Sequence, residues 1–537
     1  LPPSISPSTT LRAIVELFER QTQPTLLILE DLHWARESLE IIEALLSILN
    51  TAPLLIIGSY RTEERADLPD RLPGMQQIRL ARLEPEQIAA LSEAMLGEMP
   101  PAPLVALLDS ETEGNILFLI EMMRTLAERA GGLETISLSD SSPFSVSAGG
   151  ILAMLRRRLE RLPAEMRPLL EAMAIAGRVL DMHMLHMLIE LFPLMQPRGG
   201  TEDWLLACAD AGVFEVFDGQ WRFTHDKLRE VLRVDVIERG ALPELSTMIA
   251  LSIEAAYPDD DGRAQRAALL ADHWLHAGNR EREAAALEMA THTALKNALY
   301  DQALEFSLRA RPLVQGDRNC TVRILAQSVE AQYNLGRMPK ARDDALRTLA
   351  LLGFRLHQQP QHQQRIIPLL RARSAMQRLG EHLSRPLHDA LSRLADIGQP
   401  IDGMDDITYS VIAMKMFERL TLTHYFSNQR TETAYYALHA VNIAEGTAAA
   451  RIADRLRGYA SGAVALASSF RQQAHAFVRR ADQIAGQVQD DNALVWHLLA
   501  TGIFAVIQAD WEDGERRLLR CIEIASRIGD VRRTIEA

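Results

Sequence analysis

The stretch Leu26-Leu27-Ile28-Leu29-Glu30-Asp31-Leu32-His33-Trp34-Ala35 decides the fold expected for the first part of the chain. Four apolar residues run into two adjacent carboxylates, which is typical of a buried parallel strand. Ligands bind at the carboxyl ends of such strands. Carboxylates there hold Mg²⁺ and orient or deprotonate a water that attacks a phosphate. On these residues alone, a buried strand that ends in a solvated acidic pair explains the pattern equally well.

A second apolar run follows after a stretch with helical patterning. It is Leu54-Leu55-Ile56-Ile57-Gly58, it continues into Ser59-Tyr60-Arg61, and residues 37–49 before it have the pattern of a helix. Strand, helix and strand at this spacing form a βαβ unit, whose handedness makes the two strands parallel neighbours. We therefore expect Asp31 and Arg61 side by side at one edge of the sheet. An arginine beside two metal-binding carboxylates suits the γ-phosphate of a nucleotide.

These residues resemble a known family, the STAND-type signalling ATPases, which are relatives of the AAA+ proteins. The stretch Leu26 to Ala35 is similar to their extended Walker B motif, and Ser59-Tyr60-Arg61 is similar to their sensor-1 motif. The resemblance implies that Glu30 and Asp31 hold Mg²⁺ and the attacking water. It also implies that Arg61 contacts the γ-phosphate of ATP.

A later stretch, Glu113-Gly114-Asn115-Ile116-Leu117-Phe118-Leu119, resembles a signature in the helical lid of the same family. The resemblance implies that Asn115 and Ile116 contact the bound nucleotide. Ile116 stands where the family usually has proline, which helps to shape the adenine pocket, so this departure weakens the case for ordinary nucleotide binding. The alternative is a helix start that packs the three following apolar residues into a core.

The first part of the chain lacks the phosphate-binding loop of such ATPases. No G-x-x-x-x-G-K-[ST] motif occurs in the sequence, and the first residue is Leu1 rather than methionine. Backbone amides and the lysine of that loop normally hold the β- and γ-phosphates. We expect residues 1–82 to be the C-terminal half of a P-loop NTPase core, with the loop upstream and a further short strand at residues 77–80. The chain as given is expected to bind ATP or ADP with Mg²⁺ weakly and to hydrolyse little or none, whereas the full-length protein is expected to hydrolyse ATP.

Beyond this core we expect a helical lid at residues 83–132, a linker at 133–150 and a winged-helix-like domain at 151–240. Alternating apolar and polar residues around Asp218-Gly219 predict a β-hairpin after several helices. The stretch from Phe223 to Arg229 resembles the end of the winged helix in STAND ATPases. The resemblance implies that His225 contacts the β-phosphate of ADP, although a structural histidine fits the sequence equally well. The basic triplet Arg156-Arg157-Arg158 fits a solvated face better than a phosphate contact.

The winged-helix-like stretch does not have the charge of a DNA reader. Residues 148–240 contain 12 Lys and Arg against 14 Asp and Glu, a net charge of −2. A domain that reads DNA should be distinctly basic. We therefore interpret this domain as an intramolecular clamp, and DNA binding through it is disfavoured.

Residues 241–537 have the pattern of an array of tetratricopeptide-like helical hairpins. Stacked hairpins present an extended concave surface that suits a protein or peptide partner. In the family, such arrays sense an inducer or partner and hold the ATPase shut. The repeat register between residues 358 and 404 cannot be set from the sequence. The nearby pair His357 and His362 lacks the further ligands that a metal site needs.

The composition of the whole chain fits this assignment. The fold class expected is mainly α, with a partial α/β N-terminal domain, in a chain of 537 residues that is long enough for three or four domains. The net charge of −14 argues against a membrane-surface or nucleic-acid-coating role. Three widely spaced cysteines and the lack of a signal peptide or membrane-spanning run predict a cytoplasmic protein.

Three functions remain open on the sequence. The first is a nucleotide-gated signalling ATPase in which ATP binding opens the clamp, the array responds to a partner, and hydrolysis resets the switch. The second is an interaction scaffold with a vestigial nucleotide site, which the missing loop, Ile116, and Arg36 in place of the usual Asp all favour. The third is a transcription regulator that binds DNA.

Overall fold

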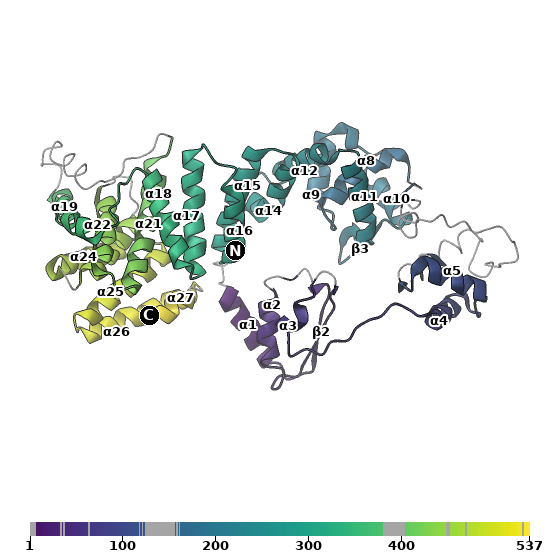
Figure 1. Ribbon diagram of the computed structural model, residues 1–537, viewed down its shortest axis with the longest axis horizontal. Coiled ribbons are helices and arrows are strands. Elements are labelled where there is room, and N and C mark those ends of the chain that lie inside the picture. Colours follow the sequence, from purple (N-terminus) through teal and green to yellow (C-terminus); the bar gives the residue numbers. More distant parts are fainter. Residues whose placement is uncertain are drawn as a thin grey trace. The chain divides into compact units, whose positions relative to one another are not determined.

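The chain is mainly helical, with a small parallel sheet, a β-hairpin and a long helical array, as predicted (Figure 1). The computed structural model describes residues 7–32, 35, 38–62, 65–116, 119–120, 122–123, 156, 159–160, 162–379, 403–446, 452–467, 470–528 and 531–537. Contacts divide the chain into two compact units. One contains Leu1–Gly74, Ala264–Ala271 and Arg280–Ala537, and the other contains Met75–Arg263 and Asp272–Asn279.

The predicted βαβ unit is present near the start of the chain. Strands β1 (Thr25–Leu29) and β2 (Leu54–Gly58) pair in parallel and are connected through α2 (Ser38–Leu46), which contacts α1 (Pro7–Glu19). One face of the sheet is buried or half-buried, and α2 buries three apolar side chains of its own. The opposite face carries four apolar side chains that are 49% to 60% exposed. These are Leu26, Ile28, Leu55 and Ile57.

The prediction of a short strand at residues 77–80 is wrong. The segment has no regular secondary structure, and it pairs with neither strand of the sheet described for this part of the chain. It lies between α3 (Leu68–Arg71) and α4 (Pro85–Leu96), and Ile78 and Leu80 are 79% and 92% exposed. An apolar pattern makes a strand only where another strand offers its backbone hydrogen bonds, and the pattern alone does not reveal that partner.

The stretch expected to form the lid is helical where it is described. Helix α4 begins with a capping box between Glu84 and Gln87, at the predicted helix start, and α5 follows at Ala102–Thr112. Leu119 and its neighbours on a further helical stretch pack with Ile88 and Leu104 in one core. Leu119 is fully buried, as the alternative reading of this stretch expected, whereas Leu117 and Phe118 lie outside the described residues.

In the next part of the chain, residues 162–223 form three α-helices followed by a hairpin. The helices are α8 (Arg167–Ala176), α9 (Met182–Leu191) and α10 (Thr201–Asp210), with short 3₁₀ turns at Ala164–Met166 and Pro193–Met195. Strands β3 (Phe214–Phe217) and β4 (Gln220–Phe223) then pair antiparallel, and α11 (Asp226–Glu238) and α12 (Leu242–Ala256) follow.

The predicted hairpin turn and a cluster of aromatic rings hold this domain together. Asp218 and Gly219 both have positive φ, 50° and 73°, as a tight two-residue hairpin turn requires. The Phe214 ring contacts the rings of Trp204 and Phe223, with centroids 5.4 and 4.8 Å apart. Trp204 donates a hydrogen bond to the carbonyl of Met166 at 3.2 Å, so the hairpin is anchored to the helices.

The rest of the described chain is a series of helices, most of which contact a helix close in sequence. Neighbours pair as hairpins, for example α15 with α16, α17 with α18, α21 with α22, α23 with α24, and α25 with α26. The bounds are α13 Asp260–Gln265, α14 Ala267–His276, α15 Arg280–Lys296, α16 Tyr300–Ala310, α17 Arg318–Asn334, α18 Met338–Leu351, α19 Pro360–Leu379, α21 Asp406–Phe426, α22 Arg430–Gly446, α23 Ile452–Leu466, α24 Arg471–Ala485, α25 Asp491–Ile507, α26 Trp511–Arg527 and α27 Val531–Glu536.

Some of the sequence-based predictions fall on undescribed residues. These are His33, Trp34 and Arg36 of the Walker B-like stretch, the linker at 133–150, and Arg157 and Arg158. Within the described residues, no helix is both long and apolar enough to cross a membrane.

Candidate functional site

The carboxyl edge of the parallel sheet brings three of the predicted site residues to one place. The last register pair is Leu29 with Gly58, so Glu30 and Asp31 leave β1 where Ser59 and the residues after it leave β2. The Ser59 amide donates to the Leu29 carbonyl at 2.9 Å, and the Ser59 carbonyl accepts from the Leu32 amide at 2.8 Å. The Ser59 hydroxyl accepts a third hydrogen bond from the Asp31 amide at 3.1 Å.

The backbone at this edge is unusual in two ways. Asp31 has φ of 57°, in the left-handed region that few residues other than glycine adopt. Gly58 leaves room for a neighbour, because a Cβ atom there would lie 2.4 Å from a methyl carbon of Leu32. Leu32 is 6% exposed, so its burial under the edge holds the turn that carries the two carboxylates.

The donor set at this edge fits Mg²⁺ with a phosphate. Glu30 and Arg61 are exposed and Asp31 is half-buried, so all three can be reached by a ligand. Among the described residues, no group of three or more His, Cys, Asp or Glu side chains forms a metal site. Two carboxylates are nonetheless enough for Mg²⁺, which keeps several waters and takes phosphate oxygens as further ligands.

The remaining predicted site residues belong to the other compact unit. Asn115 and Ile116 follow the turn that ends α5, in which Glu113 and Gly114 have φ of 47° and 72°. The Leu83 amide donates to the Gly114 carbonyl at 2.8 Å, and a Cβ atom at position 114 would lie 2.2 Å from the Leu83 carbonyl oxygen. The glycine of the lid-like signature is therefore required by backbone packing.

The two side chains predicted to contact nucleotide beyond the sheet edge differ in exposure. Ile116 is 49% exposed, so its side chain is available to a ligand. His225 is half-buried at the N-cap position of α11, directly after β4. Its contact with a phosphate stays a prediction.

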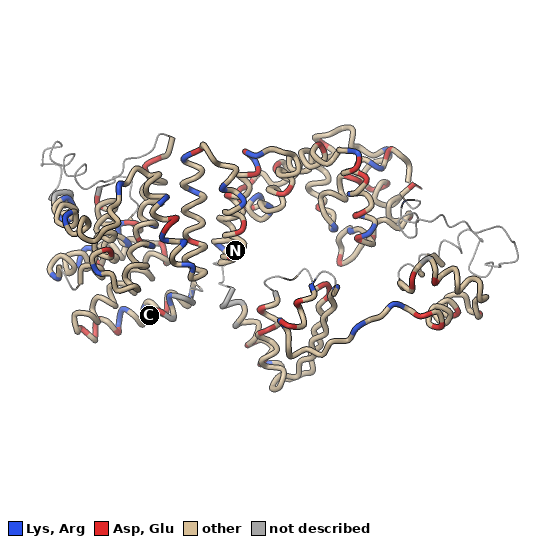
Figure 2. The backbone as a smooth tube through the Cα atoms, viewed as in Figure 1, with Lys and Arg blue, Asp and Glu red and all other residues tan. Residues whose placement is uncertain are grey.

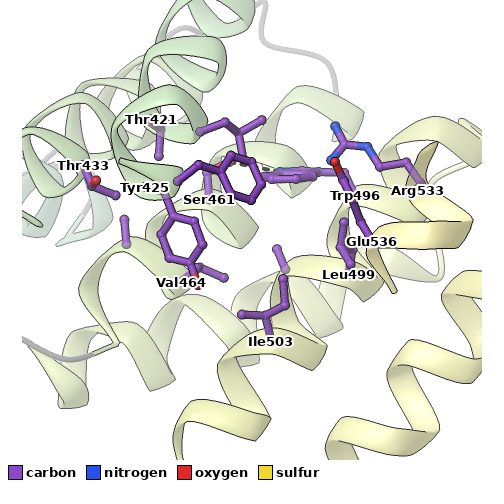
Figure 3. A pocket seen from close by; sticks show the side chains of 14 residues that line it. Thr421, Tyr425, Thr433, Ser461, Val464, Trp496, Leu499, Ile503, Arg533 and Glu536 are labelled. Carbon is purple, nitrogen blue, oxygen red and sulfur yellow. Dashed lines mark hydrogen bonds and ion pairs between the residues drawn. The ribbon is translucent and has the colours of Figure 1, made fainter. Parts of the chain in front are cut away.

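The sequence did not predict a pocket that lies within the helical array (Figure 3). It has a volume of about 210 Å³ and is walled by α21, α22, α23, α25 and α27. The lining side chains are Thr421, Leu422, Tyr425, Phe426, Thr433, Ser461, Val464, Ala465, Trp496, Leu499, Ala500, Ile503, Arg533 and Glu536. The one sequence signal for it is the apolar character of α25, which the repeat pattern explains as core.

The chain was compared with family models, with curated protein sequences and with solved structures, and only the solved structures gave a match. No family model matches the chain, and no curated protein sequence matches it. Among solved structures, the chain is similar to a signal transduction ATPase with numerous domains (STAND) protein with a tetratricopeptide repeat sensor from Pyrococcus horikoshii. The sequence identity is 13%, the match covers 98% of this chain and 85% of that chain, and the TM-score is 0.27. A TM-score this low carries no argument about function.

Proposed function

We propose that this chain is part of a nucleotide-regulated signal-transduction ATPase, a conformational switch whose helical array binds a protein or peptide partner. The observation that carries the proposal is the edge of the parallel sheet, where Asp31 and Arg61 follow paired strands and Ser59 ties the two segments together. Carboxylates and a guanidinium at the carboxyl ends of parallel strands suit a bound nucleotide.

Each residue of this edge has a chemical role in the proposal. Glu30 and Asp31 would hold Mg²⁺ and orient or deprotonate the attacking water, in an order that we leave open. Arg61 would pair with the γ-phosphate and so distinguish ATP from ADP. Mg²⁺ would supply charge neutralisation of the phosphates.

The exposed face of the sheet supports a larger nucleotide domain. Parallel sheets are covered on both faces, yet the face formed by Leu26, Ile28, Leu55 and Ile57 exposes about half or more of each side chain. We propose that the remainder of a nucleotide-binding core, including a phosphate-binding loop, covers this face.

The charges of α8 to α11 support a clamp rather than a DNA reader. Figure 2 shows Lys and Arg interspersed with Asp and Glu along these elements. Arg167 and Arg156 pair with Asp235 at 2.7 and 3.3 Å, and Arg239 pairs with Glu171 at 2.5 Å. Basic side chains neutralised within their own domain contribute little to phosphate binding. We therefore propose that this domain acts as a winged-helix clamp and that His225 contacts the β-phosphate of a bound ADP.

A nucleotide-inactive interaction scaffold is the second candidate function. The identity of Ile116 favours it, because a flexible aliphatic side chain replaces the proline that shapes the adenine pocket in the family that this stretch resembles. Both candidates use the helical array to bind a partner.

The deciding experiment measures Mg²⁺-ATP binding and turnover. It uses this chain and a longer protein that contains the upstream phosphate-binding loop, each with Asp31→Ala and Arg61→Ala. Asp70→Ala, an exposed carboxylate on α3, is the matched control. We expect the longer protein to bind and hydrolyse ATP, Asp31→Ala to abolish turnover, Arg61→Ala to weaken binding of ATP more than of ADP, and Asp70→Ala to change neither. Absence of binding to both proteins at millimolar ATP would reject the ATPase in favour of the scaffold.

A further inference from the structure

The pocket in the helical array is built from three successive parts of the array. Tyr425 comes from α21, Val464 from α23, and Trp496 and Ile503 from α25, and Figure 3 shows their side chains around one open space. The volume of about 210 Å³ exceeds that of cavities of about 150 Å³ that hold a benzene molecule. At the same volume per atom, a molecule with about eight to ten non-hydrogen atoms fits a space of this size.

Two hydroxyl groups of the wall are already occupied within the protein. The Thr421 hydroxyl donates to the Phe417 carbonyl at 2.7 Å, and the Thr433 hydroxyl donates to the Gln429 carbonyl, also at 2.7 Å. A sugar or an ion would lose its hydration here without gaining equivalent hydrogen bonds, which is costly.

The indole N–H of the pocket also has its partner inside the protein. Trp496 donates from Nε1 to the Ser461 hydroxyl at 3.0 Å, which orients the indole. Apart from the Tyr425 hydroxyl, this wall therefore offers a ligand mainly aromatic and aliphatic surface.

Among the described lining residues, the charged ones are Arg533 and Glu536 on α27. Arg533 and Glu536 form an ion pair at 2.8 Å, with side chains 12% and 21% exposed. The Arg533 guanidinium carbon lies 4.6 Å from the centroid of the Trp496 ring. Because Glu536 offsets the charge of Arg533, this end suits a neutral polar group such as a hydroxyl or carbonyl better than a carboxylate.

We propose that this pocket binds a small, uncharged, mainly apolar molecule, of the size of a bicyclic aromatic compound. The ligand would pack on Trp496 and Tyr425 and place any neutral polar group toward Arg533 and Glu536. Since α21, α23, α25 and α27 belong to successive parts of the array, occupancy links these parts and stiffens the array. Ligand binding stands independently of the proposed ATPase function, and only a coupling between ligand and nucleotide rests on that function.

The test is calorimetric titration and thermal unfolding without nucleotide, with 2-naphthol and indole as neutral probes and 2-naphthoate as the charged comparison. We expect saturable one-to-one binding of a neutral probe, a rise in the melting temperature, and at least tenfold weaker binding of 2-naphthoate. Ala465→Leu fills the pocket and should weaken binding at least tenfold with the circular dichroism spectrum unchanged. Ala285→Leu, the same change at an exposed position of α15, should leave binding as it is.

Three results would overturn the proposal: no binding of either neutral probe to the unaltered protein, equal binding by folded Ala465→Leu, or equal binding of the charged comparison. If Ala465→Leu does not fold, Ala500→Leu on α25, which also lines the pocket, serves the same purpose. Glu536→Gln provides an independent check, because it leaves the charge of Arg533 without its partner and should narrow the difference between 2-naphthoate and 2-naphthol. Since none of these measurements includes ATP, their failure is distinct from a failure of the ATPase proposal.

Discussion

Asp482 on α24 accepts two hydrogen bonds from the guanidinium of Arg517 on α26, at 2.7 and 2.9 Å, across 35 residues of sequence. Similar pairs recur at nearly the same separation along the array. Glu288 pairs with Arg323 and Glu445 with Arg480, each 35 residues apart, and Asp301 pairs with Arg337 at 36. Tetratricopeptide repeats have a period of about 34 residues. These ion pairs therefore link equivalent positions of consecutive repeats.

Replacing Arg517 should destabilise the array. This side chain is 14% exposed and also bonds to Asp513 and to the Thr501 hydroxyl, so Arg517→Met removes one donor from each of two carboxylates and from a hydroxyl. We expect a loss of about 2 kcal/mol in the free energy of unfolding by urea. Arg516→Met is the matched control, since Arg516 is 75% exposed and pairs only with Asp513 among the bonds described, and it should cost less than about 0.5 kcal/mol. Equal losses in the two variants would contradict the cross-repeat role.

The half-buried ion pair of Glu330 and Arg419 should make the stability of the array depend on pH. Burial alone would raise the pKa of Glu330, but the charge and the hydrogen bonds of Arg419, at 2.9 and 2.7 Å, outweigh burial and lower the pKa to about 2. The ionised form is thus favoured in the folded state, so its stabilisation is complete above the unfolded pKa of about 4.3 and is lost as the pH falls toward 2. Glu330→Gln should cost about 2–4 kcal/mol at pH 7.

The measurement for this pair is urea unfolding of both proteins at neutral pH and at successively lower pH. The difference between the unaltered protein and Glu330→Gln should stay constant down to about pH 5 and then shrink. The double variant Glu330→Leu/Arg419→Met removes both charges and should recover most of the stability lost at neutral pH. If the difference in the free energy of unfolding does not change with pH, the charge of the Glu330 carboxylate is not the cause of the stability lost in Glu330→Gln.

Replacing two alanines at turns between helices by glycine should stabilise the array. Ala298 and Ala509 have φ of 57° and 62°. The equivalent turn between α17 and α18 also has a residue with positive φ, but that residue is Gly336. Glycine adopts this conformation without strain, so Ala298→Gly and Ala509→Gly should each raise the free energy of unfolding by about 0.5–1 kcal/mol. Ala285→Gly, within α15, should instead lower it by about 1 kcal/mol. The same sign at the turns and in the helix would contradict the conformational explanation.

The turn after α5 offers a test of close backbone packing. Gly97 and Gly114 both have positive φ, 81° and 72°, but a Cβ atom at 97 would meet nothing within 4 Å whereas one at 114 would overlap the Leu83 carbonyl. Gly97→Ala should therefore cost about 1 kcal/mol from strain alone. Gly114→Ala should cost on the order of 3 kcal/mol and raise hydrogen exchange in α4 and α5. Similar losses at both positions would mean that the overlap is relieved by a small shift.

Local patterns allowed accurate prediction where the structure itself is local. The Asp218-Gly219 turn, the capping box at Glu84 and the βαβ unit were predicted because the residues that specify them are close in sequence. The strand expected at residues 77–80 was wrong because its existence depends on a partner strand elsewhere.

Features formed by residues that are far apart in the chain could not be predicted from the sequence. Cross-repeat ion pairs such as Asp482 with Arg517 join positions that no short window of sequence contains. The repeat register that could not be set between residues 358 and 404 lies partly outside the described residues. The array pocket draws its walls from positions 421 to 536. Its aromatic and aliphatic side chains are indistinguishable in sequence from those that fill a core.

Ser59 should position Asp31 for the proposed nucleotide chemistry. Its hydroxyl accepts the Asp31 amide at 3.1 Å, and Asp31 adopts the left-handed conformation at this point. Ser59→Ala removes the acceptor and frees that turn, so in the longer protein that contains the phosphate-binding loop we expect ATP turnover to fall about tenfold. Ser59→Thr keeps the hydroxyl and should restore turnover to within about twofold of the unaltered protein. If the alanine and threonine variants turn over ATP at the same rate, the hydroxyl does not position Asp31, and the backbone bonds from Ser59 to Leu29 and Leu32 are sufficient to hold the edge.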